Sequence, residues 1–274
     1  MSLYHYTDVN AVQSILSKQK IWLTDIRFLN DSQELHDGMS FLKETLNAPM
    51  PSLFSNHDYV DKAIEQIKKA LSDTVNFGIS EEPLFIFSLS QTDNALSQWR
   101  AYGNYCIEFD VNKLQESISN LHKCTYLTKE KLNTSVYSIA GAIGTISQDL
   151  GKNSGCTGPD YFEAILKLIE NAATFKHIGF IEEKETRIIM SANESEYPNN
   201  IKFRSRGDIL IPYLEVDLPL DCIKSIRVGP MANQELALSS MSLFLNNLQA
   251  NWQVDNSDYG FIIDLEKSDI PFRE

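Results

Sequence analysis

The chain has 274 residues, of which 24 are Lys or Arg and 37 are Asp or Glu, so its formal net charge is −13. This balance opposes long-range attraction to DNA or RNA and disfavours a non-specific nucleic-acid-binding protein. No apolar run is long enough to span a bilayer, and no leader-like pattern is visible. The four cysteines form no C-x-x-C pair, so neither a zinc site nor a disulfide framework is expected. We therefore expect a cytoplasmic globular protein that does not contact a membrane.

The first elements are expected to be a strand, a helix and a second strand. Residues 2–7, SLYHYT, read as extended, and Asp8 is a good N-cap for the helix that follows at apolar spacing. KIWLTD, residues 20–25, has the composition of a short strand.

The rest of the chain predicts a mixture of helices and strands without regular alternation. Between residues 111 and about 180 the pattern is mainly helical, interrupted by the loop-forming GKNSGCTGPD at 151–160. Because strands and helices do not alternate, the fold class is α+β rather than doubly wound. No linker is visible, so residues 1–274 form one domain with a helical insertion. Helices are predicted over residues 30–46, 57–73, 94–104 (stopped by Gly103) and 233–248, and strands over 84–90, 105–111, 185–192, 208–218 and 222–230.

His5 is the first candidate for a functional side chain. Period-2 alternation places it on one face of the first strand with Leu3 and Thr7, while the flanking tyrosines share the other face. A histidine at the edge of a core is more often satisfied by the backbone than bound to a ligand. The spacing alone therefore favours a structural role.

A strand-to-helix turn supplies a second group of candidates. FSLSQTDNALSQWRAYG, residues 87–103, gathers Ser88, Trp99, Arg100 and Tyr102. The structural alternative is that the arginine packs its guanidinium on the neighbouring indole ring.

Two further polar segments have simple structural interpretations. In LNDSQE, Asn30 stands at a helix start, and Glu34 can serve as the capping-box partner. KFRSR, residues 202–206, is the compact basic cluster of the chain, and we interpret it as a solvated surface loop, although it could serve a nucleic acid.

Paired carboxylates mark FIEEKETRIIM, residues 180–190. As a strand, this segment places Glu183, Glu185 and Arg187 on one face. Two carboxylates on one face repel unless a cation or a ligand lies between them. Arg187 can be that cation in an exposed ladder, which is worth about 1 kcal/mol or less.

Six segments in order resemble a bacterial family of unknown function, DUF2971, over nearly the whole chain. They are LYHYT, IWLTDIRFLNDSQE, FSLSQTDNALSQWRAYG, EEKETR, IRVGP and KSDIPFR. The opening LYHYTDVNAVQSILSKQKIWLT is more distantly similar to ADP-ribosyltransferases, particularly DNA-modifying toxins and RNA 2′-phosphotransferases. That resemblance implies a mixed, split β-sheet and an NAD cleft walled by the first helix and second strand. The arginine-bearing toxin motif after the first strand is not plainly present, which leaves the substrate class open.

The resemblance also implies residue roles. In those enzymes a His at the end of the first strand hydrogen-bonds an NAD ribose, and a Glu on a later strand completes the site. His5 matches the first role, and Glu185, ahead of Glu183, is the candidate for the second. Its carboxylate would stabilise the oxocarbenium-like state that forms as nicotinamide leaves, much as in glycoside hydrolysis. Trp22, Trp99 and Tyr102 compete for the middle aromatic element of those enzymes. Trp99 or Tyr102 would stack on nicotinamide, and Arg100 or Arg187 would meet the pyrophosphate. The cofactor-binding candidates are His5, Thr7, Trp22, Asn30, Ser88, Trp99, Arg100, Tyr102 and Arg187.

The leading hypothesis is thus an NAD-consuming ADP-ribosyltransferase, acting as a toxin or phage-defence effector. NAD is its substrate, no metal is expected, and the acceptor is left open among protein, small molecule and nucleic acid, as is an antitoxin or operon partner. One alternative is a metal-dependent nuclease, because Glu182-x-Lys184 is an E-x-K pattern, with Asp25 as a weak candidate for the further acidic residue. The other is a non-catalytic protein that binds a nucleotide or a partner, which a plugged cleft around His5 would favour.

Overall fold

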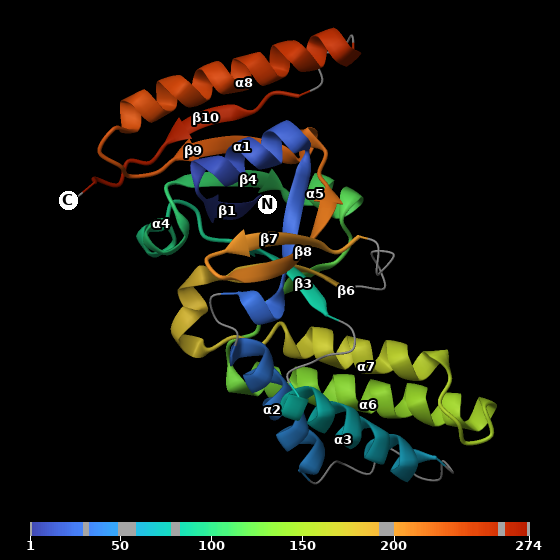
Figure 1. Cartoon of the computed structure of the whole chain (residues 1–274). Coiled ribbons are helices and arrows are strands. Elements are labelled where there is room, and N and C mark those ends of the chain that lie inside the picture. The colour runs from blue at the N-terminus through green and yellow to red at the C-terminus, as the bar shows by residue number, and fades with distance from the viewer. Residues whose placement is uncertain are drawn as a thin grey trace.

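The fold is built on a mixed sheet of ten strands flanked by helices (Figure 1). The computed structural model describes residues 2–29, 33–48, 59–77, 83–191, 200–256 and 261–272. The strand order is β10-β9-β4-β1-β3-β2-β8-β7, while β6 pairs with β3 and with β5. Only the β9–β10 pair is parallel among these strands. The α+β class predicted from the sequence is confirmed.

The strands and helices agree closely with the sequence pattern. The strands are β1 (Ser2–Thr7), β2 (Lys20–Asp25), β3 (Leu84–Ser90), β4 (Tyr105–Asp110), β5 (Leu121–Lys123), β6 (Glu185–Ser191), β7 (Lys202–Arg206), β8 (Ile209–Asp217), β9 (Ile223–Val228) and β10 (Asp264–Lys267). The helices are α1 (Val9–Lys18), α2 (Gln33–Asn47), α3 (Val60–Phe77), α4 (Leu96–Tyr102), α5 (Val111–Ser117), α6 (Thr128–Lys152), α7 (Pro159–Ala172) and α8 (Gln234–Asn256), with short 3₁₀ turns η1 (Ile26–Phe28), η2 (Ile178–Glu183) and η4 (Leu220–Cys222).

Local chemistry sets the ends of the elements near the site. Asp8 caps α1 as expected, because its carboxylate accepts a hydrogen bond from the backbone N–H of Ala11. Helix α4 ends at Gly103, whose φ of +131° suits a glycine. A Cβ at this position would lie 2.4 Å from the carbonyl oxygen of Thr7, so the end of α4 packs directly on the end of β1.

Two hydrophobic cores lie against opposite faces of β3. Phe85, Phe87 and Leu89 point into the first core, which joins β1, β4, β8 and β9 to α1, α5 and α8. Leu84 and Ile86 point into the second core, which α2, α3, α6 and α7 fill. This alternation follows from the two-residue period of a strand buried on both faces. Figure 1 shows the second group of helices gathered at one end of the molecule.

The helical part comes from two places in the chain rather than one. The sequence predicts a helical insertion at about 111–180, but that stretch also contains β5, and its helices α6 and α7 pack with α2 and α3 from between β2 and β3. Amphipathic faces do not reveal which other helix will cover them. In the described residues no helix has the length and apolar character needed to cross a membrane.

Candidate functional site

The sheet splits along one edge of β3. Strand β6 covers the whole of the other edge, pairing Leu84–Ser90 with Ser191–Glu185. On the split edge, β1 pairs with β3 at Ser90, and β2 pairs at Phe85 and Ile86. Ser88 lies between these two contacts and has no strand partner on that edge. Ser88 is two residues from both Ile86 and Ser90, which pair on this edge. Because backbone groups of alternate residues point to the same edge of a strand, the carbonyl of Ser88 points into the gap between β1 and β2.

His5 on β1 fills this gap in the sheet. Its Nδ1 lies 2.9 Å from the carbonyl oxygen of Ser88, and its ring stacks on Phe87 with centroids 4.2 Å apart. A carbonyl can only accept, so Nδ1 carries the proton and Nε2 is left as an acceptor. Burial lowers the pKa of His5 to about 4, with the Ser88 carbonyl opposing the shift. The imidazole is therefore neutral at neutral pH, and no partner of Nε2 is recorded among the described residues.

A buried ionic cluster forms a second part of the site, where β6 begins. Lys176 Nζ lies 2.6 Å from Glu183 Oε2 and 2.5 Å from Glu185 Oε2. Arg187 Nε donates to Glu185 Oε1 over 2.7 Å, and its Nη2 donates to Glu34 on α2. The cluster thus holds three carboxylates and two cations. It retains one net negative charge.

Glu183 and Glu185 differ in what occupies their carboxylate oxygens. Both oxygens of Glu185 are bound by cations, and its side chain is 6% exposed. Burial opposes its ionisation, but Arg187 and Lys176 outweigh that effect and lower the pKa of Glu185 to about 2. The side chain of Glu183 is 16% exposed. Its Oε1 is contacted by the hydroxyl of Tyr102 over 3.3 Å, a long hydrogen bond.

The expected strand face around Glu183 is only partly correct. Glu185 and Arg187 do share a face of β6, but Glu183 belongs to η2. Lys184 between them is in the left-handed conformation at φ 45°, so the strand alternation stops there. The expected exposed ladder is therefore wrong: Arg187 is 2% exposed, and its ion pairs are buried.

A cavity of about 830 Å³ brings these groups together. Its wall includes His5 at the sheet gap, Glu183 and Glu185 of the ionic cluster, and side chains of α1 and β2. Of the candidate catalytic and cofactor-binding residues, those that line it are His5, Thr7, Trp22, Ser88, Tyr102, Glu183, Glu185 and Arg187. An imidazole from the start of the chain and carboxylates about 180 residues later thus share one cavity.

Three other sequence candidates do not contribute to the described wall. Trp99 is 3% exposed, packs edge-on against Tyr6 and donates to Asn94, so it belongs to the core. Arg100 is exposed and is not among the lining residues. Asn30 lies outside the described residues. The helix start that Glu34 was expected to cap also lies outside the described residues, and the carboxylate of Glu34 binds Arg187.

The three aromatic candidates are therefore no longer equivalent. Lys18 and Arg204 both lie over the Trp22 ring, at 5.3 and 5.5 Å from its centroid, and Tyr213 lies against it. Tyr102 is 41% exposed and lines the cavity, and no ring contact is recorded for it among the described residues. Burial and the neighbouring Glu183 raise the pKa of Tyr102 to about 12, so the phenol stays protonated. Of the three aromatic candidates, Tyr102 therefore has the ring face on which a planar ligand can stack.

The structure adds cavity residues that sequence reasoning missed. Glu34, Lys176 and Phe180 line the wall beside Glu183. Arg204 and Arg206 line it from β7, so KFRSR is a strand rather than the expected loop; all of its residues except Arg204 are exposed, as expected of a solvated segment. The alternating basic residues of KFRSR were a usable signal, because a strand places them on one face. Lys176 gave no such signal, since it follows a helix and meets its partners only in three dimensions.

The nuclease pattern is not assembled into a site. Glu182 and Lys184 are exposed, and neither lines the cavity. Asp25 is fully buried and forms its ion pair with Arg27. Within the described ranges there is no group of three or more His, Cys, Asp or Glu residues that could hold a metal ion. The geometry therefore gives this alternative no support.

Part of the chain matches the model of a known protein family. Residues 98–188 match DUF2971, a protein family of unknown function. The DUF2971 match runs from α4 into β6 and contains Tyr102, Lys176, Glu183 and Glu185, whereas His5 and the β7–β8 hairpin lie outside it. No curated protein and no solved structure is significantly similar to the chain. The comparisons give no support for the resemblance to ADP-ribosyltransferases, so any such function has to be argued from the cavity.

Proposed function

We propose that the protein is an NAD-dependent ADP-ribosyltransferase that binds NAD in the cavity at the sheet gap. The observation that carries the proposal is that His5 and Glu183 line the same cavity. Its volume of about 830 Å³ is within the range of small-molecule sites, roughly 300–1,000 Å³. The gap between β1 and β2, with α1 and β2 as a wall, is the arrangement expected of an ADP-ribosyltransferase-like split sheet.

The charge of the ionic cluster suits the departure of nicotinamide. As the glycosidic bond breaks, positive charge develops on the ribose, and a fixed negative charge beside it lowers the barrier. The cluster has one net negative charge and is held rigid by Lys176 and Arg187, so it needs little reorganisation during the reaction. The two cations also keep Glu185 ionised over the physiological pH range.

Glu183, rather than the initially favoured Glu185, is the better candidate for the catalytic carboxylate. Glu185 has both oxygens occupied by cations. Glu183 has one oxygen fixed by Lys176, while the other makes only the 3.3 Å contact with Tyr102. A ribose hydroxyl can replace that long contact. In this assignment Glu183 touches the ribose and can accept the proton of the acceptor group, and Glu185 is a positioning residue that acts through Lys176.

His5 and Tyr102 complete the binding of the nicotinamide riboside. Neutral His5 offers Nε2 as an acceptor for a ribose hydroxyl, because Nδ1 is committed to Ser88. The ring of Tyr102 offers a face on which nicotinamide can stack. Neither role requires a change of protonation near pH 7, since burial keeps the imidazole neutral and the phenol protonated.

The test is release of nicotinamide from NAD by the purified protein, measured chromatographically with water, protein, DNA and RNA offered as acceptors. Wild type should release nicotinamide, and Glu183→Gln should reduce the rate by roughly 100-fold or more, the usual effect of removing a group that stabilises transition-state charge. Glu182→Gln is the matched control, because this exposed neighbour does not line the cavity.

Two outcomes would contradict the proposal. Wild type that releases no nicotinamide with any acceptor is not this enzyme, and if it still binds NAD the non-catalytic nucleotide-binding alternative applies. Equal rates for Glu183→Gln and wild type would remove the proposed carboxylate from the reaction.

A further inference from the structure

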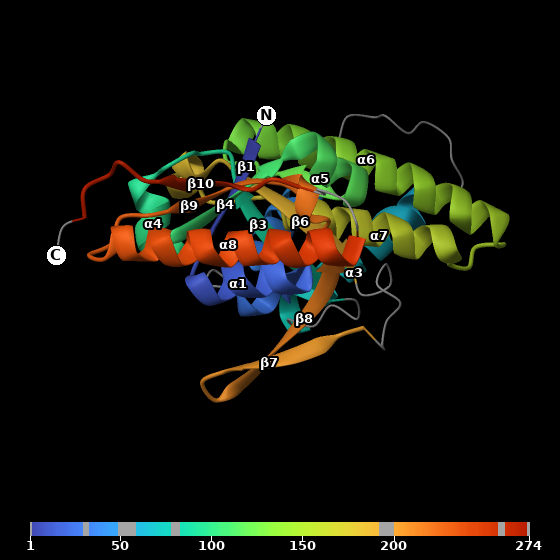
Figure 2. The same cartoon turned by 90° about the horizontal axis from the view of Figure 1, so that it is seen from above.

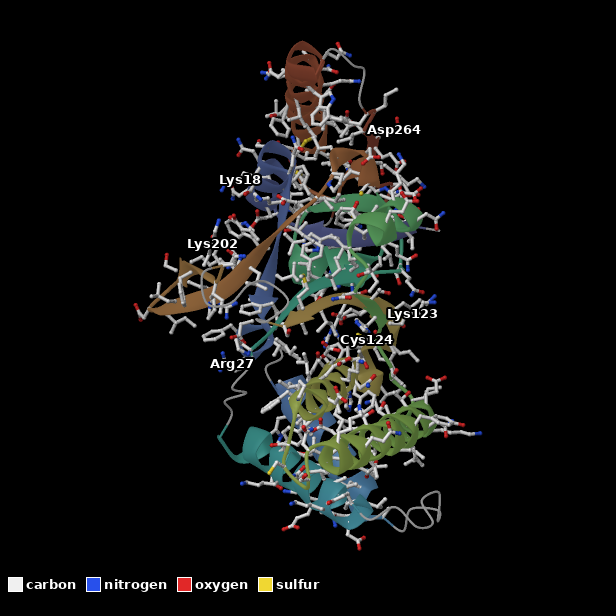
Figure 3. All side chains as sticks on the ribbon, turned by 90° about the vertical axis from the view of Figure 1, so that its right-hand side faces the viewer. Lys18, Arg27, Lys123, Cys124, Lys202 and Asp264 are labelled. Carbon is white, nitrogen blue, oxygen red and sulfur yellow. The ribbon has the colours of Figure 1, made fainter. Side chains whose placement is uncertain are left out.

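Two arginines of β7 also line the cavity, on a strand that does not contribute to the ionic cluster. In the β7–β8 hairpin, Arg204 pairs with Ile211 and Arg206 with Ile209, so both arginines point to one face. On β2, the same face carries Trp22 and Thr24, which also line the cavity. Figure 2 shows this hairpin reaching out from the body of the molecule, and Figure 3 shows Lys202, the first residue of β7, on it.

Arg204 is held in place by uncharged groups. Its guanidinium lies 5.5 Å from the ring centroid of Trp22 and 5.9 Å from that of Tyr213, and one nitrogen donates to Thr24 Oγ1 over 2.9 Å. Arg206 donates from one nitrogen to the carbonyl oxygen of Phe28 over 3.1 Å. A guanidinium has five N–H donors, so each side chain keeps most of its donors for a ligand.

The two arginines also lack the carboxylate partners that the other cavity cations have. Lys176 and Arg187 pair with glutamates, and Lys20 pairs with Asp217. Neither Arg204 nor Arg206 forms an ion pair with any described residue. Burial lowers the pKa of Arg204, and the positive charge of Arg206 lowers it further. Two like charges placed side by side on a cavity wall, in a chain of net charge −13, create a site that an anion would stabilise.

We propose that Arg204 and Arg206 form a phosphate-binding subsite that takes the pyrophosphate of the dinucleotide. The assignment of the phosphates to a dinucleotide rests on the proposed function. Planar guanidinium groups bind phosphate oxygens through two parallel hydrogen bonds, and the contacts of Arg204 with Trp22 and Thr24 restrain its side chain in advance. This replaces Arg187, whose donors are used inside the ionic cluster, and Arg100, which lies outside the described wall.

The subsite gives the cavity opposite charges at its two ends. Strand β3 shows how far apart the two ends lie. Arg204 donates a hydrogen bond to Thr24, whose strand partner on β3 is Ile86. At the other end of β3, the hydroxyl of Ser90 donates to the backbone carbonyl of Glu183. Ser90 lies four residue steps beyond Ile86 along the strand, a distance of about 13 Å. His5 is anchored midway, at Ser88. Pyrophosphate at the positive end would leave the nicotinamide riboside, where cationic charge resides, near the negative end.

The test is titration of ADP-ribose into wild type and variants by calorimetry, because this ligand carries the pyrophosphate but requires no turnover. Arg204→Gln and Arg206→Gln should each weaken binding roughly tenfold, the loss expected for a charged hydrogen bond. Lys202→Gln is the matched control, since it removes the same charge from the same strand face while its side chain pairs with Glu215 outside the cavity lining. Arg206 is exposed, so its variant remains informative if Arg204→Gln does not fold.

The outcomes separate this inference from the proposed function. Arginine-dependent binding of ADP-ribose by a wild type that releases no nicotinamide supports the subsite and contradicts the proposed function. Wild-type affinity in both arginine variants, or no binding of ADP-ribose by wild type, overturns the subsite. Binding of a single-stranded oligonucleotide that falls in the variants, with ADP-ribose binding unchanged, also overturns it and assigns the arginines to a nucleic acid.

Discussion

His5 Nδ1 donates a hydrogen bond to the carbonyl oxygen of Ser88 at a position of β3 that neither β1 nor β2 covers. A side chain therefore satisfies a backbone acceptor that the divergence of two strands leaves unpaired. Burying an unpaired carbonyl costs free energy, so the hydrogen bond from His5 lowers the cost of the gap between β1 and β2. The same bond fixes the tautomer and presents Nε2 as an acceptor. One residue thus serves both the fold and the candidate site.

The neutral state of His5 predicts a specific pH dependence of stability. Its pKa falls from an ordinary 6.5 to about 4 on folding, so the unfolded chain binds more protons between these values. The stability that His5 contributes is present above pH 6.5 and is lost as the pH falls toward 4, by up to about 3 kcal/mol. Urea unfolding of wild type and His5→Gln at several pH values measures the difference. An imidazole that titrates at 6.5 or above in an NMR experiment would contradict this prediction.

Glu185→Gln should destabilise the protein, because Glu185 neutralises two buried cations. Its pKa falls from an ordinary 4.5 to about 2 on folding, so its contribution of about 3 kcal/mol is present above pH 4.5 and is lost as the pH falls toward 2. Glu183→Gln should cost less than Glu185→Gln, since Lys176 keeps its bond to Glu185. Free energies of unfolding at pH 7 compare the two variants. Equal losses would show that the two carboxylates are not distinguished by burial.

Tyr102 should contribute to NAD binding through its ring. Tyr102→Phe keeps the ring and should leave KM for NAD within about threefold of wild type, whereas Tyr102→Leu should raise KM roughly tenfold through the loss of aromatic stacking. Steady-state nicotinamide release measures both. If Tyr102→Phe raises KM for NAD as much as Tyr102→Leu does, the hydroxyl contact with Glu183 rather than the ring carries the effect.

Gly103→Ala should destabilise the junction between α4 and β1. The residue has φ +131°, and an added Cβ would meet the Thr7 carbonyl oxygen at 2.4 Å, a backbone atom that cannot move without displacing the cavity wall. We expect a loss of about 2 kcal/mol or more in urea unfolding. Gly207→Ala is the control, because Gly207 also has a positive φ but a Cβ there meets no atom within 4 Å. Similar losses in both variants would attribute the effect to backbone conformation alone.

Much of the secondary structure could be predicted from local sequence. The Asp8 cap, the end of α4 at Gly103, and strands β2, β3 and β6 follow from spacing and turn chemistry that act over a few residues. Two of the interpretations that the structure corrects, the exposed ladder of Arg187 and the loop of KFRSR, concern polar side chains whose partners are distant in the chain. Glu34 binds Arg187 across 153 residues, and Arg204 meets Thr24 across 180.

By itself, the sequence determined the α+β class, most element boundaries and the choice of His5, Glu183 and Glu185 as a set to examine. Hydrophobic periodicity and helix capping depend on residues close together in the chain, so they can be recognised from the sequence alone. Only the tertiary structure decided that these groups share a cavity, that Glu185 is enclosed by cations while Glu183 keeps an accessible oxygen, and that the basic strand β7 faces the same space. The physical reason is that burial and charge pairing depend on which distant segments of the chain pack together, as β1 and β2 do on either side of Ser88.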